Sequence, residues 1–359
     1  MSALSRFRTL GRSGLIVSPL ALGTMTFGNT AWGSDATTSA AVLAAYVESG
    51  GNFIDTADVY AEGRSEEFVG DFIAERGLRD QLVLATKFTF HAGDDSNVNS
   101  GGNGRKNMYR AIDGSLKRLK TDYVDLFWMH AWDRVTPVEE VLQSLGDLVS
   151  AGKIRYFAFS DVPAWYAASA ATRAQVQNVP GPIALQLEYS LTERAIEREH
   201  IPAARELGLG IMPWSPLAAG FLAGKYHRDA EGNAIPAGGR LDNAHQPFRK
   251  FTERNWAILD VVRAVATEVG QTPARVALAW AAVQPGITSV ILGARTVEQC
   301  RENIASADVQ ISASHLERLD AVSAPEDIFP YPIFGDDINR EAIFGGSTVE
   351  GWQHQRAGR

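Results

Sequence analysis

Residues 50–60 read Gly-Gly-Asn-Phe-Ile-Asp-Thr-Ala-Asp-Val-Tyr, and this stretch is the starting point for the fold. The glycines bring the chain out of a preceding helix, and Phe53 and Ile54 begin a short apolar strand that Asp55 closes. A carboxylate at the end of a buried strand is costly to desolvate unless a cation or several donors meet it. Tyr60 follows on the loop that leaves the strand. The stretch suggests a functional site. An aspartate that caps the following turn, next to a tyrosine at the edge of the fold, explains it equally well.

The rest of the chain repeats this alternation of strand and helix. Apolar runs without polar alternation, as expected for parallel strands buried on both faces, lie at residues 20–22, 53–54, 82–86, 124–129, 154–159, 183–187, 209–212 and 289–292. Segments of helical length and pattern lie at residues 37–49, 65–76, 106–118, 137–150, 163–171, 197–206, 253–269 and 297–306. This succession of strand–helix units, preceded by a hairpin at residues 7–17, predicts an α/β fold with a single (β/α)8 TIM barrel.

A doubly wound sheet that binds a dinucleotide is the main alternative for such a chain. That fold needs a Gly-x-Gly-x-x-Gly turn directly after a strand and at the start of a helix. The nearest approach, Gly-Gly-Asn-Gly at residues 101–104, follows a polar loop instead of a strand. The sequence therefore favours the barrel.

Two long loops interrupt the repeat. Residues 89–104 are polar and follow the third strand, and residues 217–250, rich in glycine and charge, follow the seventh. Long loops in a compact domain are usually functional.

We expect a single barrel domain over residues 1–359, with its core at about 18–323 and a C-terminal tail at 324–359. The tail is expected to fold over a barrel face, and its last residues, 353–359, to be disordered.

Composition limits the possible partners. A net charge of −8 and a pI near 5.5 argue against a nucleic-acid partner, for which a basic face is expected. The single cysteine, Cys300, excludes an internal disulfide and a cysteine-based metal site. No stretch approaches the roughly 20 apolar residues that span a bilayer, and the first residues do not resemble a signal peptide. We expect a cytoplasmic protein without a metal; the sequence leaves a homo-oligomer open.

Polar residues stand at the ends of the predicted strands. In a barrel of this kind, chemistry is built from residues at the carboxyl ends of the strands, which share one rim. The residues at these positions are Asp55, Lys87, His130, Ser160, Gln186, Trp214 and Ser215. The sequence therefore places them close together, whatever their distance along the chain.

These residue types suit a carbonyl substrate. Lys87 and Asp55 on neighbouring strands can form a buried ion pair, and the ammonium is expected to lower the pKa of the Tyr60 phenol. Such a phenol can give a proton to a carbonyl oxygen that gains negative charge. A neutral His130 can donate to the same oxygen. Each residue alone has an ordinary structural explanation, such as a surface lysine, but their coincidence at matching strand ends favours a site.

Four motifs carry a family resemblance. They are residues 51–70, with Asp55, Tyr60, Glu66 and Gly70; Leu-Ala-Thr-Lys at 84–87; Asp-Leu-Phe-Trp-Met-His at 125–130; and Trp-Ser-Pro-Leu-Ala-Ala-Gly at 214–220. Together they resemble the aldo-keto reductase superfamily, from residue 7 to about residue 323. The last motif, with Gly-Lys-Tyr at 224–226, is most similar to the branch that holds bacterial reductases and potassium-channel β subunits.

The resemblance implies an NADP(H)-dependent oxidoreductase acting on CH–OH groups. Hydride would pass from NADPH to an aldehyde or ketone while Tyr60 protonates the oxygen, and the matching catalytic tetrad is Asp55, Tyr60, Lys87 and His130. The alternative within this branch is an NADPH-sensing regulatory subunit with slow turnover, like the channel β subunits, although no long inactivating segment precedes the first strand.

The resemblance also implies cofactor contacts. Trp214 would stack on the nicotinamide, Ser160 and Gln186 would hold its carboxamide, and Arg295 suits a 2′-phosphate because arginine binds phosphate in bidentate fashion. Arg240 is a weaker candidate for that phosphate. The full expected set is Thr24, Asp55, Ser160, Gln186, Trp214, Ser215, Leu217, Gly220, Lys225, Arg240, Gly293, Arg295, Gln299, Glu302 and Asn303.

One position departs from the family pattern. Many relatives have Ser-Asn or Ser-Arg after the fifth strand, whereas this chain has Ser160 followed by Asp161. Because a carboxylate cannot donate a hydrogen bond as an amide does, Ser160 is the better candidate for the carboxamide.

The expected substrate pocket is aromatic. Its candidate residues are Met25, Phe27, Trp32, Tyr60, Phe88, His130 and Trp132. An aromatic mouth suits a bulky or ring-bearing carbonyl, including a keto-sugar. Simple packing at the rim is the alternative for several of these residues.

Overall fold

The computed structural model describes residues 3–29, 31–93, 96–229, 234–235, 241 and 250–349. Eight parallel strands form one sheet in the order β12-β3-β4-β5-β6-β7-β8-β9. The strands are β3 (Leu20–Gly23), β4 (Phe53–Asp55), β5 (Val83–Phe88), β6 (Val124–Met129), β7 (Ile154–Ser160), β8 (Ala184–Glu188), β9 (Gly210–Trp214) and β12 (Val290–Gly293). This arrangement confirms the predicted (β/α)8 barrel.

The sheet closes on itself less firmly between β9 and β12 than elsewhere. Among the described residues the pairing on this side is a single bridge between Ile211 of β9 and Ile287, three residues before β12, in place of a ladder. The N–H of Thr288 donates to the Ile211 carbonyl at 2.8 Å. On its other side β12 pairs with β3 over four residues, from Val290 with Leu20 to Gly293 with Gly23.

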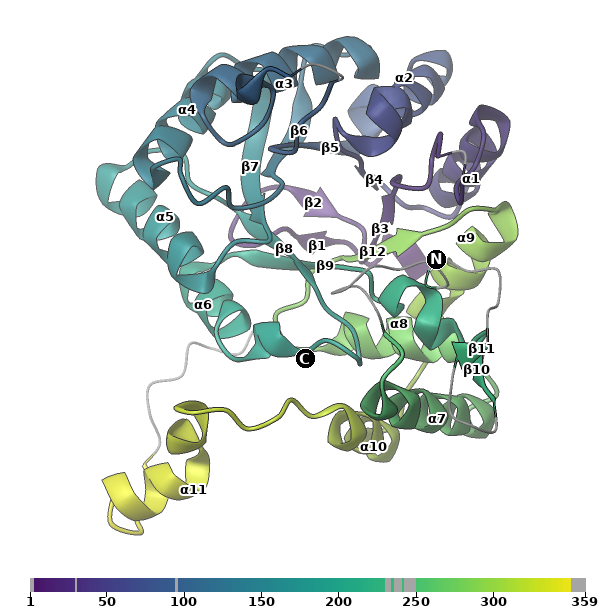
Figure 1. Ribbon diagram of the computed structural model, residues 1–359, viewed down its shortest axis with the longest axis vertical. Coiled ribbons are helices and arrows are strands. Elements are labelled where there is room, and N and C mark those ends of the chain that lie inside the picture. Colours follow the sequence, from purple (N-terminus) through teal and green to yellow (C-terminus); the bar gives the residue numbers. More distant parts are fainter. Residues whose placement is uncertain are drawn as a thin grey trace. The chain divides into compact units, whose positions relative to one another are not determined.

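Helices surround the sheet (Figure 1). They are α1 (Ala36–Glu48), α2 (Arg64–Arg76), α3 (Arg105–Leu119), α4 (Val138–Ser150), α5 (Ala164–Gln177), α6 (His200–Leu207), α7 (Glu253–Glu268), α8 (Pro273–Val283), α9 (Val297–Ile304) and α10 (Ala313–Ser323). Side chains of Asp35, Thr252, Thr272 and Thr296 cap the first turns of α1, α7, α8 and α9. The sequence prediction did not include α8 and α10.

The barrel has two buried apolar clusters, and the N-terminal hairpin covers the amino ends of its strands. One buried cluster lies inside the barrel and includes Phe53, Leu126 and Met212, whereas a larger one lies between the strands and the helices. Leu10 and Val17 of the hairpin β1 (Arg8–Thr9) and β2 (Ile16–Val17) are buried in the inner cluster. The hairpin therefore closes the amino ends of the strands.

Gly11 makes that close approach possible. It lies at φ +60°, and a Cβ atom there would come 2.3 Å from the Ile183 carbonyl oxygen at the start of β8. A larger residue would push the hairpin off the barrel.

The two predicted loops contain short elements. Residues 89–104 hold a 3-10 turn, η4 (Val98–Ser100). The described parts of 217–250 hold η6 (Ala218–Ala223) and the strand pair β10 (His227–Arg228) and β11 (Ala234–Ile235).

The chain separates into two compact units, Met1–Ser323 and Ala324–Arg359. In the second unit a short helix, α11 (Asp336–Ile338), lies between η9 (Tyr331–Phe334) and η10 (Asn339–Ile343). Docking of the tail on a barrel face stays a prediction, and residues 353–359 lie outside the described part of the chain.

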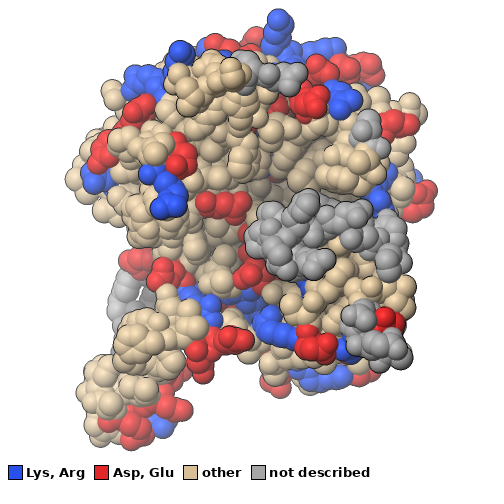
Figure 2. Space-filling model, in the orientation of Figure 1, with Lys and Arg blue, Asp and Glu red and all other residues tan. Residues whose placement is uncertain are grey.

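Charges of both signs are mixed on the surface. On the face shown in Figure 2, the Lys and Arg residues that are described lie interspersed with Asp and Glu. No helix in the described ranges combines the length and apolarity needed to cross a bilayer.

Candidate active site

A cavity of about 730 Å³ opens at the carboxyl ends of the strands. Its wall includes Asp55 at the end of β4, Ser160 at the end of β7, Trp214 at the end of β9 and Gly293 at the end of β12. These residues are far apart in the sequence, and the parallel strands bring them to one rim. The cavity therefore lies where the sequence places it.

Lys87 connects Asp55 to Tyr60. Its side chain is fully buried in β5, and its Nζ donates to Asp55 Oδ2, to the Thr56 carbonyl at 2.8 Å and to the Tyr60 hydroxyl at 3.3 Å. The second oxygen of Asp55 accepts from Gln186 Nε2 at 3.1 Å. Because these partners replace water, the ion pair can remain charged inside the protein.

The surroundings set the protonation states of these groups. Burial alone would lower the pKa of Lys87, but Asp55 and Tyr60 outweigh it and the pKa is raised, so the ammonium is retained. Desolvation raises the pKa of Tyr60 by more than the Lys87 charge lowers it. The expectation of a lowered phenol pKa is therefore wrong, and Tyr60 stays protonated at neutral pH.

His130 is the neutral partner of Tyr60. Desolvation and then the Lys87 charge hold its pKa well below the usual value. Its ring meets the Tyr60 ring edge-on, with centroids 5.8 Å apart, and it also meets the Phe90 ring edge-on, with centroids 4.6 Å apart. Its Nδ1 is buried without a hydrogen-bond partner among the described residues. A neutral imidazole at the cavity wall can donate one hydrogen bond to a substrate.

Two further acidic residues, Asp58 and Glu66, are buried on either side of Tyr60 in the sequence. The Glu66 carboxylate accepts from Thr86 Oγ1 at 2.5 Å and from Arg118 Nε at 2.6 Å. Asp58 is 3% exposed, and its Oδ1 has no partner among the described residues. Desolvation and the charge of Glu66 raise the pKa of Asp58 to about 8. Asp58 is thus protonated at neutral pH.

Four further residues at the carboxyl ends of β7, β8 and β9 line the cavity, and one of them, Gln186, contacts Asp55 of the tetrad. Ser160 and Gln186 pair across β7 and β8, and both line the cavity. The indole N–H of Trp214 donates to Asp161 Oδ1 at 3.0 Å. Asp161 also lines the cavity.

The loop after β9 curls around one end of the cavity. Ser215, Ala218, Ala219 and Gly220 have φ values of +54°, +49°, +55° and +92°. Within this turn the N–H groups of Ala218, Ala219 and Gly220 donate to the Ser215 carbonyl, to Ser215 Oγ and to the Leu217 carbonyl at 2.8, 3.0 and 2.9 Å, and these bonds hold the loop in its shape. Lys225 lines the same part of the cavity.

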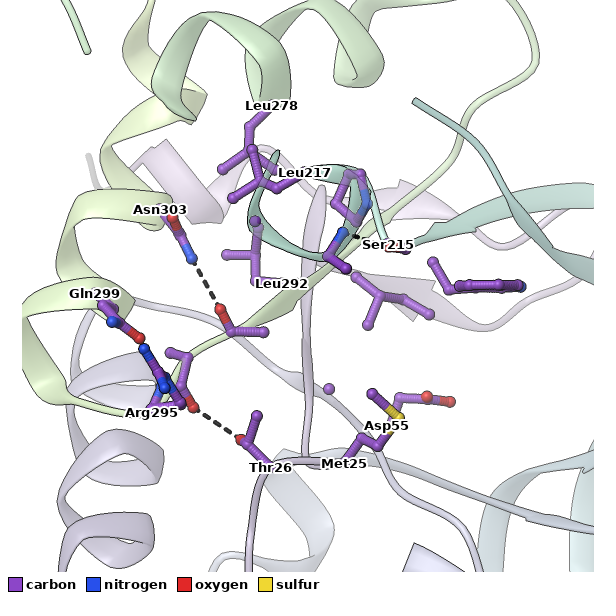
Figure 3. Close-up of a pocket in the computed structure, with 18 of the residues that line it drawn as sticks. Met25, Thr26, Asp55, Ser215, Leu217, Leu278, Leu292, Arg295, Gln299 and Asn303 are labelled. Atoms are coloured by element: carbon purple, nitrogen blue, oxygen red, sulfur yellow. Dashed lines mark hydrogen bonds between the residues drawn. The ribbon is translucent and has the colours of Figure 1, made fainter. Parts of the chain in front are cut away.

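The start of α9 forms the opposite end, shown in Figure 3. Asn303 Nδ2 donates to the Gly293 carbonyl at 3.0 Å, and Thr26 Oγ1 donates to the Ala294 carbonyl at 2.9 Å. The backbone N–H of Arg295 donates to Gln299 Oε1 at 2.9 Å. These bonds fix the chain where the Arg295 side chain borders the cavity.

Most of the residues expected at the site line this cavity. From the catalytic and substrate sets these are Asp55, Tyr60, His130, Met25 and Trp32, and from the cofactor set Ser160, Gln186, Trp214, Ser215, Leu217, Gly220, Lys225, Gly293, Arg295, Gln299, Glu302 and Asn303. Lys87 reaches the site through Tyr60. Arg240 lies outside the described residues.

Four expected residues lie elsewhere. Phe27 and Phe88 are fully buried in the layer between strands and helices, and Phe88 stacks on Phe127 at 4.8 Å. Trp132 packs against Trp165 and Tyr166, with centroids 5.5 and 6.2 Å away. Thr24 is buried and hydrogen-bonded to Ser65 at 2.8 Å.

The cavity also contains residues that the sequence prediction missed. They include Thr26, Val59, Phe90, Pro216, Ala219, Ala223, Thr272, Ala274, Leu278, Ile291, Leu292 and Ala294. Phe90 follows β5 by two residues, and strict alternation would place it on the same face as Phe88; the break in the extended backbone at Thr89, with φ +121°, removes that expectation, so no sequence signal identified Phe90.

Comparisons with known proteins agree with this geometry. The aldo/keto reductase family model matches residues 19–324. The aryl-alcohol dehydrogenase (NADP+) of Phanerodontia chrysosporium is 32% identical, over 99% of this chain and 95% of that protein. An uncharacterized oxidoreductase of Bacillus subtilis, YrpG, is 36% identical, over 90% of this chain and 95% of that protein. A probable voltage-gated potassium channel subunit beta of Oryza sativa subsp. japonica is 38% identical, over 85% of this chain and 92% of that protein.

The match includes the strands whose ends carry Asp55, Lys87, His130 and Trp214. The chain therefore belongs to the aldo/keto reductase family, whose general reaction is the reduction of a carbonyl group with a nicotinamide cofactor.

Proposed function

We propose that this protein reduces an aldehyde or ketone to the alcohol with NADPH, and that Tyr60 is the proton donor. The observation that carries the proposal is the Tyr60 hydroxyl, 3.3 Å from the buried Lys87 ammonium, in the wall of one cavity with His130. A phenol, an ammonium and a neutral imidazole together can protonate a carbonyl oxygen and stabilise its developing charge.

The donor set of the cavity fits a dinucleotide. The Lys225 ammonium, which lies beside Gly220 in the cavity wall, suits a pyrophosphate. Ser160 and the Gln186 side chain, which is anchored on Asp55, suit an amide. An exposed indole face at Trp214 suits a flat ring. When bound, the cofactor would supply the hydride for the carbonyl carbon.

The choice of NADPH over NADH rests on Arg295. Its guanidinium borders the cavity at the start of α9, and arginine binds phosphate in a bidentate geometry. The aryl-alcohol dehydrogenase relative carries NADP(+) in its name. We expect Arg295→Ala to lose most of the preference, measured as the ratio of NADPH and NADH dissociation constants. An unchanged ratio would show that another cation binds the 2′-phosphate.

The residues of the chain would handle the proton. The O–H bond of Tyr60 breaks and its proton goes to the carbonyl oxygen, while the carbon gains the hydride that a bound cofactor would supply, so that the carbonyl becomes CH–OH and the phenol becomes phenolate. The Lys87 ammonium, held by Asp55, stabilises that phenolate. His130 donates to the same oxygen and orients the carbonyl.

The lining of the outer cavity suits a bulky substrate. Met25, Trp32 and Phe90 supply apolar and aromatic surface close to Tyr60 and His130. Such surface packs well on an aromatic ring or on the C–H face of a keto-sugar. We therefore propose aromatic aldehydes and bulky ketones as the substrate class to test first.

Tyr60→Phe tests the proton donor. We expect turnover to fall by about 10²-fold or more, while NADPH binding, followed by fluorescence titration, is unchanged. Tyr109→Phe on α3 is the matched control, since Tyr109 does not line the cavity. Retained turnover in Tyr60→Phe would refute the assignment.

A regulatory subunit is the second candidate, favoured by the potassium-channel relative. Such a subunit would bind NADPH and turn over slowly. Single-turnover and steady-state NADPH oxidation with aromatic aldehydes, sugar aldehydes, keto-sugars and methylglyoxal separate the two, because a reductase oxidises NADPH rapidly in one turnover and continues in the steady state with at least one of them.

A further inference from the structure

Asp161 is fixed in the cavity wall from three sides. Its N–H donates to the Gln186 carbonyl at 3.1 Å, and its carbonyl accepts from the Trp132 N–H at 3.3 Å. Its Oδ1 accepts the indole N–H of Trp214 at 3.0 Å. Its backbone is left-handed, with φ +46°, a conformation that asparagine and aspartate tolerate better than other non-glycine residues. The side chain therefore has a defined place beside Trp214 in the cavity.

The hydrogen bond restricts the Trp214 ring. An indole has a single donor, Nε1, and an acceptor on it selects one orientation of the ring plane. Trp214 is only partly buried, so packing alone leaves part of its ring without contacts. Asp161 supplies the fixed point on that side.

Asp161 also brings a charge to the site. When ionised, its carboxylate adds a negative charge to the cavity wall that Ser160, Gln186 and Trp214 line, which a neutral amide of the same shape would not do. A negative charge near a ligand favours the more positive of two ligand forms. Oxidised nicotinamide is cationic and reduced nicotinamide is neutral.

We propose that Asp161 positions the Trp214 indole and raises the affinity of the site for NADP+ relative to NADPH. The inference rests on the proposed function, because it takes Trp214 to lie against the nicotinamide.

The charge of Asp161 responds to its neighbours. Desolvation raises its pKa to about 6, against the hydrogen bond from Trp214, which lowers it. Glu188 raises the pKa further and Lys87 lowers it. The charged and titratable groups that act on Asp161 or are acted on by it are Tyr60, Lys87 and Glu188, with Asp55 and Lys250 as the ion-pair partners of Lys87 and Glu188. His130 lines the same cavity. Asp161 is therefore mostly ionised at about pH 8 and mostly protonated at about pH 5.

The test measures two dissociation constants, for NADP+ and for NADPH, by fluorescence titration of the wild type, Asp161→Asn and Asp161→Gly. Asparagine keeps the shape, an acceptor for Trp214 and the tolerance of positive φ, but removes the charge. Glycine removes the acceptor as well, without backbone strain. A new amide contact to the carboxamide would change both constants equally, so their ratio reports the charge.

At about pH 8 we expect Asp161→Asn to weaken NADP+ relative to NADPH by about three- to tenfold. At about pH 5 the wild-type ratio should approach that of Asp161→Asn, whose ratio stays constant. Asp161→Gly should also shift the Trp214 emission of the ligand-free protein, measured as the difference from a Trp214→Phe variant, whereas Asp161→Asn should not.

Equal ratios in wild type and Asp161→Asn at about pH 8 would overturn the electrostatic part. An unchanged Trp214 signal in Asp161→Gly would overturn the positioning part. If the folded wild type binds neither cofactor form, the proposed function itself fails, which is a different result from either.

Discussion

Asp58 should make the stability of the barrel fall as the pH rises. Its pKa is raised to about 8 by desolvation and by the Glu66 charge, whereas an aspartate in the unfolded chain titrates near 3.9. Between these values the folded protein holds a proton that the unfolded chain has lost. The contribution is fully present below about pH 4 and is lost as the pH rises through about 8.

The size of this change in the free energy of unfolding follows from the difference between the folded and unfolded pKa values of Asp58. Each unit corresponds to about 1.4 kcal/mol, so this group lowers the free energy of unfolding by on the order of 5 kcal/mol between about pH 4 and about pH 8. Glu66 shares the site, so the value belongs to the pair and its guanidinium partner Arg118. Asp58→Asn should remove this contribution to the pH dependence of the free energy of unfolding, because an amide does not ionise.

Urea unfolding at several pH values between 5 and 8 provides the assay. The difference between Asp58→Asn and wild type should grow in favour of the variant by about 1.4 kcal/mol per pH unit. Asp133→Asn is the control, because hydrogen bonds from Thr136 and from the Asn103 and Val135 N–H groups hold the Asp133 pKa below its usual value despite partial desolvation. Its difference from wild type should stay constant over this range. A constant difference for Asp58→Asn as well would refute the reasoning.

Two further predictions concern the tetrad. Lys87→Met should cost about 3–5 kcal/mol of stability in urea unfolding, because it leaves the Asp55 carboxylate buried without its cation, and adding Asp55→Asn should recover part of the loss. No recovery would mean that Lys87 stabilises the barrel by other contacts. Carbonyl reduction should stay nearly constant from about pH 6 to about pH 9, because the raised pKa keeps Tyr60 protonated, whereas alcohol oxidation should accelerate with pH as the phenolate forms. Steady-state rates in both directions check this, and an oxidation rate that falls with pH would contradict it.

The barrel and the positions of the strand-end residues could be predicted because they depend on order along the chain. Parallel strands bring their carboxyl ends to one rim. Asp55 of β4 pairs with Ala85 of β5, and Lys87, two residues further along β5, pairs with Trp128 of β6. Knowing which residues end each strand was therefore enough to bring Asp55 and Lys87 together.

Side-chain direction and burial were harder to predict. Phe88 follows Lys87 directly in β5, so it points to the opposite face of the sheet and packs against the helices. Trp132 lies in a loop, where no period indicates its direction, and it packs on Trp165. The sign of the Tyr60 pKa shift depends on how far the surrounding loops exclude water, and that cannot be read from motif spacing.

Because few hydrogen bonds join β9 and β12, binding of a dinucleotide should affect the stability of this junction. The loop after β9, with Ser215 and Lys225, lies on one side of this seam, and the segment after β12, with Gly293 and Arg295, lies on the other. A ligand that contacts both sides would link the two segments across the junction of the barrel that has the fewest hydrogen bonds between strands. The amide hydrogen of Thr288, which donates to the Ile211 carbonyl across this junction, should then exchange faster in the free protein than the amide hydrogens of the paired strands, and should slow on ligand binding.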